Sequence, residues 1–569
     1  MKYFDSYVDE MLYYDENIYA SRTSLGIINQ GKQPYILDNR FFSWIEGEFY
    51  NQEGLKSKHN IASETDNELF AKIYNSKRSF DFLRDIDGYY VAVLYDKKEN
   101  KIYLITDRNG LKPLYWGKVN DDFVWSSELK GFLGHVDFKP VIDSQSVEEF
   151  FGIGYLLENR TLLEGVELVP PASVLTFDLK KSKVKSIHYW YWKDIKPIRG
   201  TIDEKELVEE LGSLFKQSVR KRVKRKEKIG ISLSGGLDSR AILAAVPEDY
   251  KPLHTFTFGQ EGCDDIKIAR KVSEIKGAAH HFCNISHENW LEQRTGNVWA
   301  TDGNLNLLHM HASQCISLMK EFFDINLNGF AGDVVLGGSF LRANNLDKKI
   351  DSKIIYDVEE YEIQTENFKH WYMIDKTDPY FINNRERRFI NSGTVLIAKE
   401  IEQRKPFFDN NLIELVYGIP DALRYKSYIY IKMLLNDFPQ YYKNIPWKKT
   451  GFPIGWSKTR QFSVKVKNKI SREIGRLIFK SPELRDYTDY PLWIRQDPAK
   501  SFFEKVLLSE NALYSGYIDR NKIQDYVRDH MEKKADYHNE LCLALTFELW
   551  LQQVFEGKYR DTKKKLLSL

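Results

Sequence analysis

The stretch "ISLSGGLDSR", residues 231–240, constrains the fold more than any other part of the chain. Apolar residues precede it and the apolar run "AILAAV" follows it, so the segment is expected to connect a strand to a helix. Glycines permit a tight turn, and the first N–H groups of a helix lack intrahelical partners and attract anions. Ser234 and Ser239 add hydroxyl donors, and Asp238 can hold a cation that bridges to phosphate. The stretch predicts a magnesium–phosphate cradle, and the alternative is a plain Gly-Gly connection in an α/β sheet.

The segments around this turn predict a parallel sheet. A helix over about 203–222 precedes the strand "KIGISLS", and the helix after Asp238 leads to the strand "LHTFTFG". The helix "DDIKIARKVSEIKG" and the strand "HHFCNI" follow, and strands that alternate with helices at this spacing favour a parallel sheet covered on both faces. Beyond about residue 340 the pattern is mostly helical. The turn lacks the Gly-Lys-Ser/Thr of a Walker A loop, which disfavours transfer of a γ-phosphate.

The N-terminal part has a different pattern. From Phe42 to Asp178, short alternating segments such as "YYVAVLYD" and "KIYLITD" predict an antiparallel β-rich domain. A Pro/Gly break near residue 195 precedes an acidic helix start at Asp203 and Glu204. We therefore expect two domains, residues 1–195 and residues 196–569.

Charge and hydropathy restrict the partners. Lys plus Arg (83) nearly balance Asp plus Glu (81), so the net charge of +2 gives no global electrostatic support for nucleic acid or an anionic membrane. The basic run Arg220–Lys228 could form a nucleic-acid patch, but it falls at the end of a predicted helix, where cations complement the helix dipole. No segment approaches about 18 uninterrupted apolar residues, so no membrane span is expected.

The sequence also leads to expectations about the location of the protein in the cell and about the state of its cysteines. The N-terminus carries acidic residues and lacks the apolar core of a signal peptide, which favours the cytoplasm. The four cysteines form neither a C-x-x-C pair nor a zinc spacing, so we expect free thiols in a reducing compartment.

Several motifs in order resemble those of the asparagine synthetase family. They are "LSGGLDS", "NGFAGDVVLGG" (328–338), "EQRKPFFDNNLIE" (402–414) and "WKKTGFPI" (447–454). The N-terminal segment "DGYYVAVLYDKKENKIYLITDRNGLKPLYW" (87–116) is similar to the family's glutamine amidotransferase domain. The resemblance implies an N-terminal Ntn-hydrolase-like antiparallel β-sandwich with helices. It also implies a C-terminal doubly wound, parallel-sheet PP-loop domain of the adenine nucleotide alpha hydrolase type, with a helical end.

The chain departs from the family pattern at the glutaminase motifs. Glutamine-dependent members use a cysteine at position 2, whereas this sequence reads Met1, Lys2 and Tyr3. Glu46 replaces the asparagine that helps to stabilise the oxyanion, and a carboxylate there would repel it. We expect a lost glutaminase site, as in beta-lactam synthetase and lasso-peptide cyclase; a mis-set start codon is the alternative for position 2.

The synthetase motifs are retained with one notable change. Phe330 stands where asparagine synthetases have Glu and beta-lactam synthetase has Tyr, and phenylalanine can neither take a proton nor hydrogen-bond ammonia. Glu402 could supply a carboxylate, or it could form a structural ion pair with Arg404. Lys449 matches the family lysine that neutralises charge on the leaving pyrophosphate and the tetrahedral adduct.

The resemblance implies an ATP- and Mg²⁺-dependent, AMP-forming amide ligase. A small-molecule or peptide carboxylate is adenylated, and an amine or ammonia then displaces AMP without glutamine hydrolysis. The implied roles are pyrophosphate binding by Ser234, Gly235, Gly236 and Ser239, magnesium binding by Asp238 and Asp333, adenosine contacts by Phe258 and Gly329, and catalysis by Lys449 and Glu402. An ammonia-dependent asparagine synthetase and a catalytically silent scaffold are the alternatives. The identity of the acid and of the amine stays open, and so does assembly as a homodimer.

Overall fold

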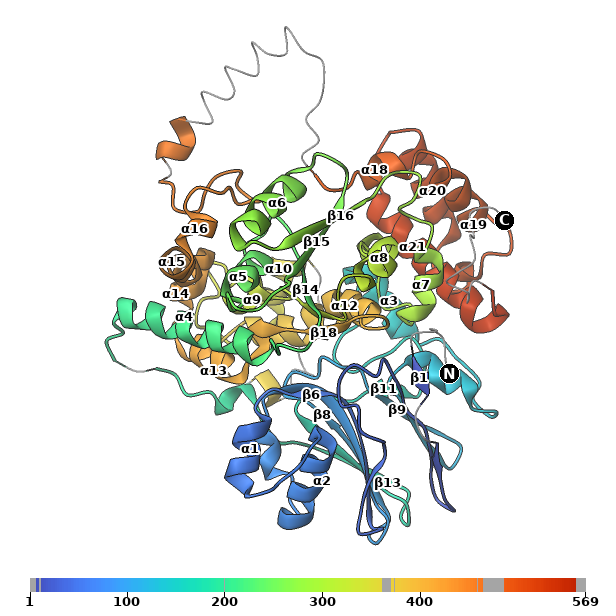
Figure 1. The fold of residues 1–569 in the computed structure, drawn as a ribbon. Coiled ribbons are helices and arrows are strands. Elements are labelled where there is room, and N and C mark those ends of the chain that lie inside the picture. Colours follow the sequence, from blue (N-terminus) through green and yellow to red (C-terminus); the bar gives the residue numbers. More distant parts are fainter. Residues whose placement is uncertain are drawn as a thin grey trace.

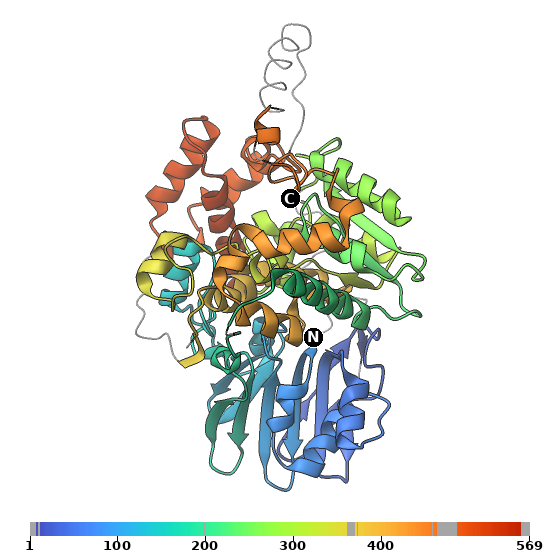
Figure 2. The same ribbon diagram turned by 90° about the vertical axis from the view of Figure 1, so that its left-hand side faces the viewer.

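The computed structural model describes residues 7–9, 12–198, 200–360, 370–372, 374–457, 459–463 and 486–558. In Figures 1 and 2 the N-terminal sheets lie at one end of the molecule, and the larger C-terminal region covers one side of them. Positions 1–3, on which the expected loss of the nucleophilic cysteine depends, lie outside the described residues.

The N-terminal region is built from antiparallel sheets, as the alternating pattern predicted. Its largest sheet has six strands in the order β13 (Lys183–His188), β12 (Ser173–Asp178), β8 (Lys101–Thr106), β7 (Gly88–Asp96), β6 (Phe41–Phe49) and β5 (Tyr35–Leu37). A second sheet has three strands, β10 (Asp122–Ser126), β9 (Tyr115–Val119) and β11 (Val166–Leu168). Two small strand pairs complete it: β1 (Val8–Asp9) with β4 (Thr23–Ser24), and β2 (Tyr13–Tyr14) with β3 (Tyr19–Ala20).

The central strands β8, β7 and β6 of the six-stranded sheet are buried on both faces, which makes this region a layered sandwich. Successive side chains of a strand point to opposite faces. On β7, Val91 and Val93 belong to one apolar cluster, against which aromatic side chains of β9 and β10 pack. Ala92 and Leu94 belong to the main core, together with residues of helix α2 (Asp66–Lys77) and of the C-terminal region.

The C-terminal region contains the expected parallel sheet. Its strand order is β16 (Ala279–Asn284), β15 (His254–Gly259), β14 (Ile229–Ser232), β17 (Ile325–Leu327) and β18 (Glu402–Arg404), and every neighbouring pair is parallel. The helices α4 (Glu204–Lys221), α5 (Asp238–Ala245) and α6 (Asp264–Lys276) occupy the predicted positions. The mixed α/β prediction is confirmed, while the three-residue strands β17 and β18 were not predicted as strands.

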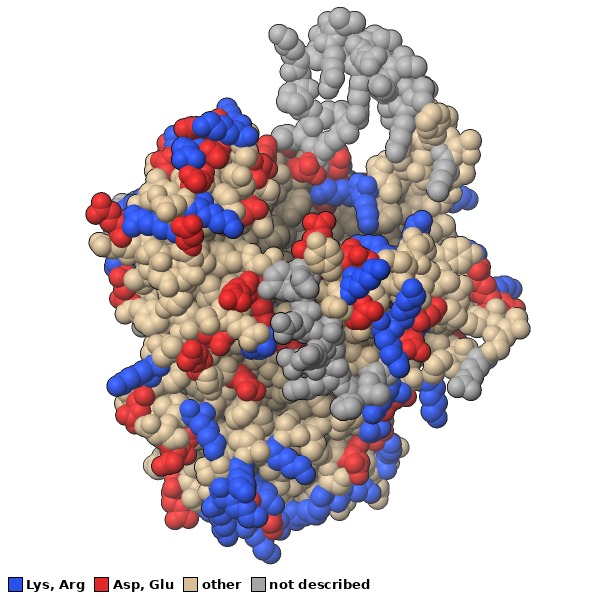
Figure 3. All heavy atoms as spheres, turned by 180° about the vertical axis from the view of Figure 1, so that it is seen from behind, with Lys and Arg blue, Asp and Glu red and all other residues tan. Residues whose placement is uncertain are grey.

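Helices make up most of the remaining chain. They include α9 (Gly332–Val335), α10 (Ser352–Glu359), α11 (Asp378–Phe381), a π-helix (Ile382–Ile390), α12 (Asn391–Ile397), α13 (Asn410–Gly418), α15 (Tyr428–Asp437), α20 (Arg520–Met531) and α21 (His538–Leu551). Within the described ranges, no helix combines the length and apolar character needed to cross a bilayer. Figure 3 shows Lys and Arg side chains interspersed with Asp and Glu over much of the face it draws.

Buried ion pairs join the N-terminal sheet to the parallel sheet. The guanidinium of Arg404 lies 2.5 Å from a carboxylate oxygen of Glu48 and 2.5 Å from one of Glu227. Lys221, in the basic run at the end of α4, lies 2.9 Å from Asp409 and 3.3 Å from Asp87. Lys221 of the basic run therefore ends a helix and also forms an ion pair with Asp87 of the N-terminal region.

The expectation of four free thiols is wrong for two of them. Cys283, on β16, forms a disulfide with Cys315, and their Cα atoms lie 6.1 Å apart. Cys263 and Cys542 are buried and free. The two bonded residues are 32 positions apart, and spacing alone does not show that the end of β16 meets the short helix around Cys315.

The buried His530 makes the stability of the fold depend on pH. Its Nδ1 accepts a hydrogen bond from the backbone N–H of Tyr537 at 3.1 Å, and burial together with the nearby Arg495 lowers the pKa of His530 to about 4. Because an unfolded histidine has a pKa near 6.5, the unfolded chain binds this proton first, and stability is lost as pH falls from about 6.5 to about 4. We expect His530→Asn to reduce the loss of unfolding free energy between about pH 7 and about pH 5 by about 1–2 kcal/mol. Urea unfolding at both pH values measures this, and an unchanged loss would show that His530 titrates normally.

Candidate functional site

The predicted cradle forms between β14 and α5. The backbone N–H of Ser234 donates to Ser239 Oγ at 3.1 Å, and that of Gly236 donates to Ser234 Oγ at 3.2 Å. The two serine hydroxyls lie 3.2 Å apart. Hydroxyls and backbone N–H groups gather at the start of α5, where the helix end favours negative charge.

The loop after β17 packs directly against the cradle. A Cβ placed on Gly329 would lie 2.9 Å from the backbone nitrogen of Ser239, and one on Gly332 would lie 2.7 Å from Cγ of Asp238. Both positions therefore require glycine for the close approach. The contact brings together two motifs that are almost one hundred residues apart in the sequence.

Asp238 and Asp333 face each other across this contact. The backbone N–H of Asp333 hydrogen-bonds the carboxylate of Asp238, which also accepts from the Tyr430 hydroxyl at 2.9 Å. Ser339 Oγ donates to Asp333 at 2.7 Å. Burial and the negative charge of Asp333 raise the pKa of Asp238 to about 8. Two carboxylates that repel each other beside a phosphate cradle form a site that a cation would stabilise.

The pair fits Mg²⁺ bound together with phosphate. Mg²⁺ prefers oxygen ligands and is commonly held by one or two carboxylates plus the phosphates of a substrate. Within the described ranges, no group of three or more His, Cys, Asp or Glu side chains is placed to hold a metal ion alone. Asp238 and Asp333 would therefore hold the ion jointly with the nucleotide.

A hairpin over Trp447–Phe452 closes one side of the cradle. The backbone N–H of Lys448 donates to the Gly235 carbonyl at 3.2 Å, and Lys448 Nζ lies 2.5 Å from Asp265. Asp265 in turn accepts from the Gly235 N–H at 2.9 Å. Lys449 is exposed on the same hairpin, with Nζ 5.6 Å from the Trp447 ring centroid.

Sequence reasoning missed Lys448 and Asp265 as members of this site. The adjacent lysines in "WKKTGF" carry no signal that tells which one faces the loop. Asp265 resembled an ordinary acidic residue in the first turn of a helix.

Phe258 lies near the end of β15 in an aromatic wall. Its ring stacks at 6.2 Å on His311 and meets Tyr487 edge-on at 6.3 Å. His311 Nδ1 lies 2.9 Å from the Tyr490 hydroxyl, and burial holds the pKa of His311 well below its usual value. A planar apolar wall beside a phosphate cradle suits the base of a nucleotide, and His311 was another residue that the sequence did not single out.

The structure places Glu402 on β18 among the charges that face the N-terminal region. Burial raises the pKa of Glu402, and the neighbouring charges that act on it are those of Lys112, Glu46, Glu48 and Arg404. Arg404 forms ion pairs with Glu48 and Glu227, in place of the ion pair with Glu402 that the sequence suggested.

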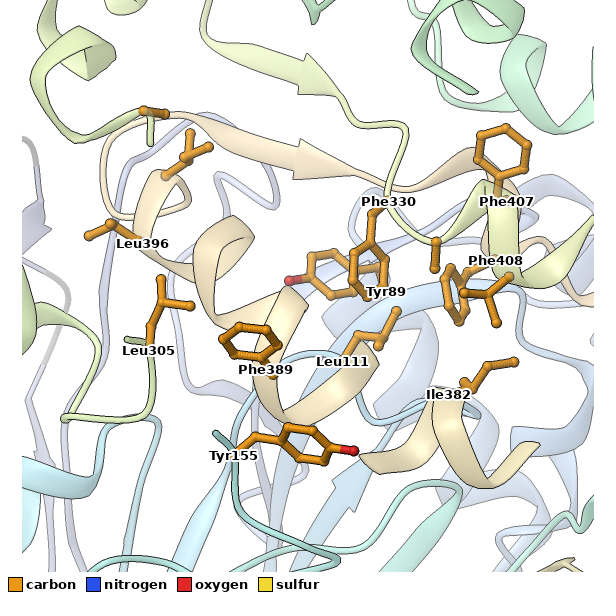
Figure 4. Close-up of a cluster of buried hydrophobic side chains, with 14 of the residues drawn as sticks. Tyr89, Leu111, Tyr155, Leu305, Phe330, Ile382, Phe389, Leu396, Phe407 and Phe408 are labelled. Carbon is orange, nitrogen blue, oxygen red and sulfur yellow. The ribbon is translucent and has the colours of Figure 1, made fainter. Parts of the chain in front are cut away.

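Phe330 belongs to an apolar cluster between the two regions. Its ring stacks on Phe408 at 5.3 Å, and Figure 4 shows the cluster with Tyr89, Leu111 and Ile382. Lys405 Nζ lies 5.0 Å from the Phe330 ring centroid. The position that could have carried a proton acceptor is thus apolar and buried.

Glu46, which stands where the family resemblance places the oxyanion-stabilising asparagine, is held in its ionised form. Lys112 Nζ lies 3.1 Å from its carboxylate. Burial would raise the pKa of Glu46, but the charge and hydrogen bond of Lys112 lower it below its usual value. A permanent negative charge at this place would repel an oxyanion.

Models of two protein families match the chain, in the same order as its two sheet regions. A glutamine amidotransferase domain matches residues 9–191, and asparagine synthase matches residues 210–373. The chain belongs to the asparagine synthetase family. Putative asparagine synthetase (glutamine-hydrolyzing) 2 of Methanocaldococcus jannaschii is 32% identical over 52% of this chain and 59% of its own length.

Two Bacillus subtilis relatives extend the similarity within the asparagine synthetase family. Asparagine synthetase (glutamine-hydrolyzing) 2 is 23% identical over 75% of this chain and 64% of its own length. Asparagine synthetase (glutamine-hydrolyzing) 1 is 22% identical over 96% of this chain and 91% of its own length. The chain spans about three fifths of the length of the first two of these relatives.

Solved structures add only distant similarities. Glutamine phosphoribosylpyrophosphate amidotransferase of B. subtilis, complexed with ADP and GMP, aligns with a TM-score of 0.21 at 15% identity over 44% of this chain and 48% of its own. NMN synthetase of Francisella tularensis aligns with a TM-score of 0.17 at 18% identity over 24% of this chain and 59% of its own.

Proposed function

We propose that this member of the asparagine synthetase family is an AMP-forming amide ligase that works without glutamine hydrolysis. The observation that carries the proposal is the contact of the cradle with the loop after β17, which unites Ser234, Ser239, Asp238 and Asp333 at one place. The site has the donors for pyrophosphate, the carboxylates for Mg²⁺ and an aromatic wall for the base.

In the first step, an oxygen of the substrate carboxylate attacks the α-phosphorus of ATP, and the bond to the β-phosphate oxygen breaks. Ser234, Ser239 and the N-terminus of α5 would bind the departing pyrophosphate. Bound Mg²⁺ would supply positive charge that offsets the charge on the phosphates. Asp238 and Asp333 would hold that ion. Lys449 would neutralise negative charge on the leaving pyrophosphate.

In the second step, an amine attacks the acyl carbon of the acyl adenylate. The C–N bond forms, AMP departs with the shared oxygen, and the amine nitrogen loses its proton. The ionised Glu46, fixed by Lys112, supports an amine or ammonia as the donor in place of the glutamine amide.

Acid-dependent ATP–pyrophosphate exchange tests the first step. Purified protein with Mg-ATP and labelled pyrophosphate is screened over a panel of carboxylic acids that includes aspartate, first without ammonium and then with it. Exchange that depends on an acid supports adenylation and names the substrate class. Absence of exchange with every acid, in the presence and absence of ammonium, would contradict the proposal.

The nitrogen donor is tested with the acid that supports exchange. Amide formation is measured with ammonium or with glutamine as donor at equal concentration. We expect product with ammonium and none above background with glutamine. Equal rates with both donors would contradict the glutamine-independent part of the proposal.

Tyr430 is expected to position Asp238 through the hydrogen bond of 2.9 Å. Tyr430→Phe removes the donor and leaves the ring. Because a hydrogen bond to a charged group contributes on the order of 1.5 kcal/mol, we expect the Mg²⁺ concentration for half-maximal exchange to rise about 10-fold. An unchanged Mg²⁺ dependence would show that the hydroxyl does not position the metal ligand.

A further inference from the structure

A third carboxylate, that of Glu386, lies close enough to the Asp238–Asp333 pair for the charges of both aspartates to act on it, and it belongs to none of the motifs. It lies on the π-helix Ile382–Ile390 and is only 5% exposed. π-Helical segments are rare in proteins and occur frequently at functional sites. The feature therefore needs an explanation beyond the sequence motifs.

The π-helix packs against the segment that holds Asp333. Phe381, the residue before it, stacks on Phe340 at 4.2 Å, and the Arg385 guanidinium lies 5.6 Å from the same ring. The neighbour of Phe340 in the sequence, Ser339, donates the hydrogen bond to Asp333.

The opposite side of the π-helix is fixed to the N-terminal region. Arg387 donates to the carbonyl of Gly110 at 2.9 Å and to that of Val169. Asn384 Oδ1 accepts from the backbone of Glu158 at 2.7 Å. These contacts hold the helix in place, so Glu386 is presented from a rigid element.

Glu386 has no direct partner in the part of the chain that the structure describes. Among the described residues, no hydrogen bond or ion pair reaches its carboxylate, whereas its neighbour Arg385 lies 3.8 Å from Glu359. Burial, followed by the negative charge of Asp333, raises the pKa of Glu386 to about 8, and Asp238 adds to the effect. A buried carboxylate with no partner is costly for the fold and is typical of a binding or catalytic position.

The surroundings of Glu386 indicate which ligand would relieve this cost. Ile382, one helical turn earlier on the same face, belongs to the apolar cluster of Phe330 and Phe408 in Figure 4. Glu386 does not complete a three-ligand metal group with the aspartates among the described residues. The negative charges of Glu386, Asp333 and Asp238, next to the apolar cluster that includes Ile382, suit a small cation, and an ammonium group has the required charge and hydrogen-bond donors.

We propose that Glu386 binds the amine substrate in its ammonium form beside the Mg-phosphate cradle and accepts the proton that the nitrogen loses before it attacks. In this step an N–H bond breaks, its electron pair stays on nitrogen as the nucleophile, and an O–H bond forms on Glu386. The inference rests on the proposed function, and it assigns the task that Phe330 cannot perform.

The test compares Glu386→Gln and Glu386→Asp with the wild-type full chain in both half-reactions. ATP–pyrophosphate exchange without amine reports adenylation, and amide formation with ammonium chloride reports the amine step. For Glu386→Gln we expect exchange within about 3-fold of wild type, a KM for ammonium raised at least about 10-fold, and loss of the wild-type pH dependence of kcat/KM for ammonium. Glu386→Asp keeps the charge, so it should recover part of the affinity and the pH dependence.

A neighbouring variant and the wild type separate the possible failures. Glu359→Gln alters a partly exposed carboxylate near Arg385 and should leave the KM for ammonium within about 3-fold of wild type. An unchanged KM and pH profile in Glu386→Gln would overturn the inference while the proposed function stands. Equal loss of exchange and amide formation in Glu386→Gln, with wild-type thermal stability, would overturn it in favour of a role in adenylation. Absence of exchange in the wild type would refute the proposed function itself.

Discussion

Asp238→Asn is expected to lower acid-dependent ATP–pyrophosphate exchange by about 1000-fold, because it removes a charged metal ligand where negative charge develops on phosphate. The same substitution should not unfold the protein. Burial and Asp333 raise the pKa of Asp238 to about 8, so its ionised form is unfavourable in the folded chain without metal. A neutral amide of the same shape relieves that repulsion, and thermal unfolding without Mg²⁺ should occur at the same temperature or higher.

Asp264→Asn is the matched control for Asp238→Asn. Asp264 also lies in the first turn of a helix of the parallel-sheet region, but its partner is Lys267 at the surface, at 3.7 Å. We expect its exchange rate to stay within about 2-fold of wild type. If Asp238→Asn also exchanges at nearly the wild-type rate, Asp238 does not hold the metal ion.

Arg404→Met is expected to cause the largest loss of stability, with the free energy of unfolding lower by about 3–5 kcal/mol. The Arg404 side chain is 1% exposed and joins Glu48 of the N-terminal sheet to Glu227 before the parallel sheet. Methionine fills much of the space, but it leaves the carboxylate of Glu48 buried without its main partner. Urea unfolding monitored by tryptophan fluorescence measures the change.

Lys224→Met tests whether burial is the cause of that effect. Lys224 also contacts Glu48, at 3.2 Å, but its side chain is 56% exposed. Exposed ion pairs contribute little, so we expect a change below about 1 kcal/mol. Similar effects of the two substitutions would contradict the account of the interface as a buried ion pair.

The two sheets were predictable because the segments that surround their strands differ. Short runs rich in aromatic and β-branched residues, bounded by turn residues, reflect strands such as β7, whereas an apolar strand followed by Gly-Gly and an apolar helix is typical of β14 and α5. The strands β17 and β18 have three residues each, which is too short for a periodic signal. Their places in the sheet follow from packing that no local pattern encodes.

The candidate site was predictable only where a motif is continuous. Ser234, Asp238 and Ser239 stand within one turn, so their proximity follows from the local geometry. Asp265 contacts the Gly235 loop from another helix, and the role proposed for Glu386 depends on the side chains that surround it. The disulfide of Cys283 with Cys315 is hidden for the same reason, since it depends on a contact between a strand end and a distant turn.

The most direct test of the central claim follows the oxygen of the substrate acid. The acid that supports exchange is labelled with ¹⁸O in its carboxylate and converted in the presence of Mg-ATP and ammonium, and the nucleotide product is analysed by ³¹P NMR and mass spectrometry. Attack of the carboxylate on the α-phosphorus predicts AMP that carries one labelled oxygen, together with unlabelled pyrophosphate. Label in inorganic phosphate together with ADP, or AMP without label, would contradict adenylation of the acid.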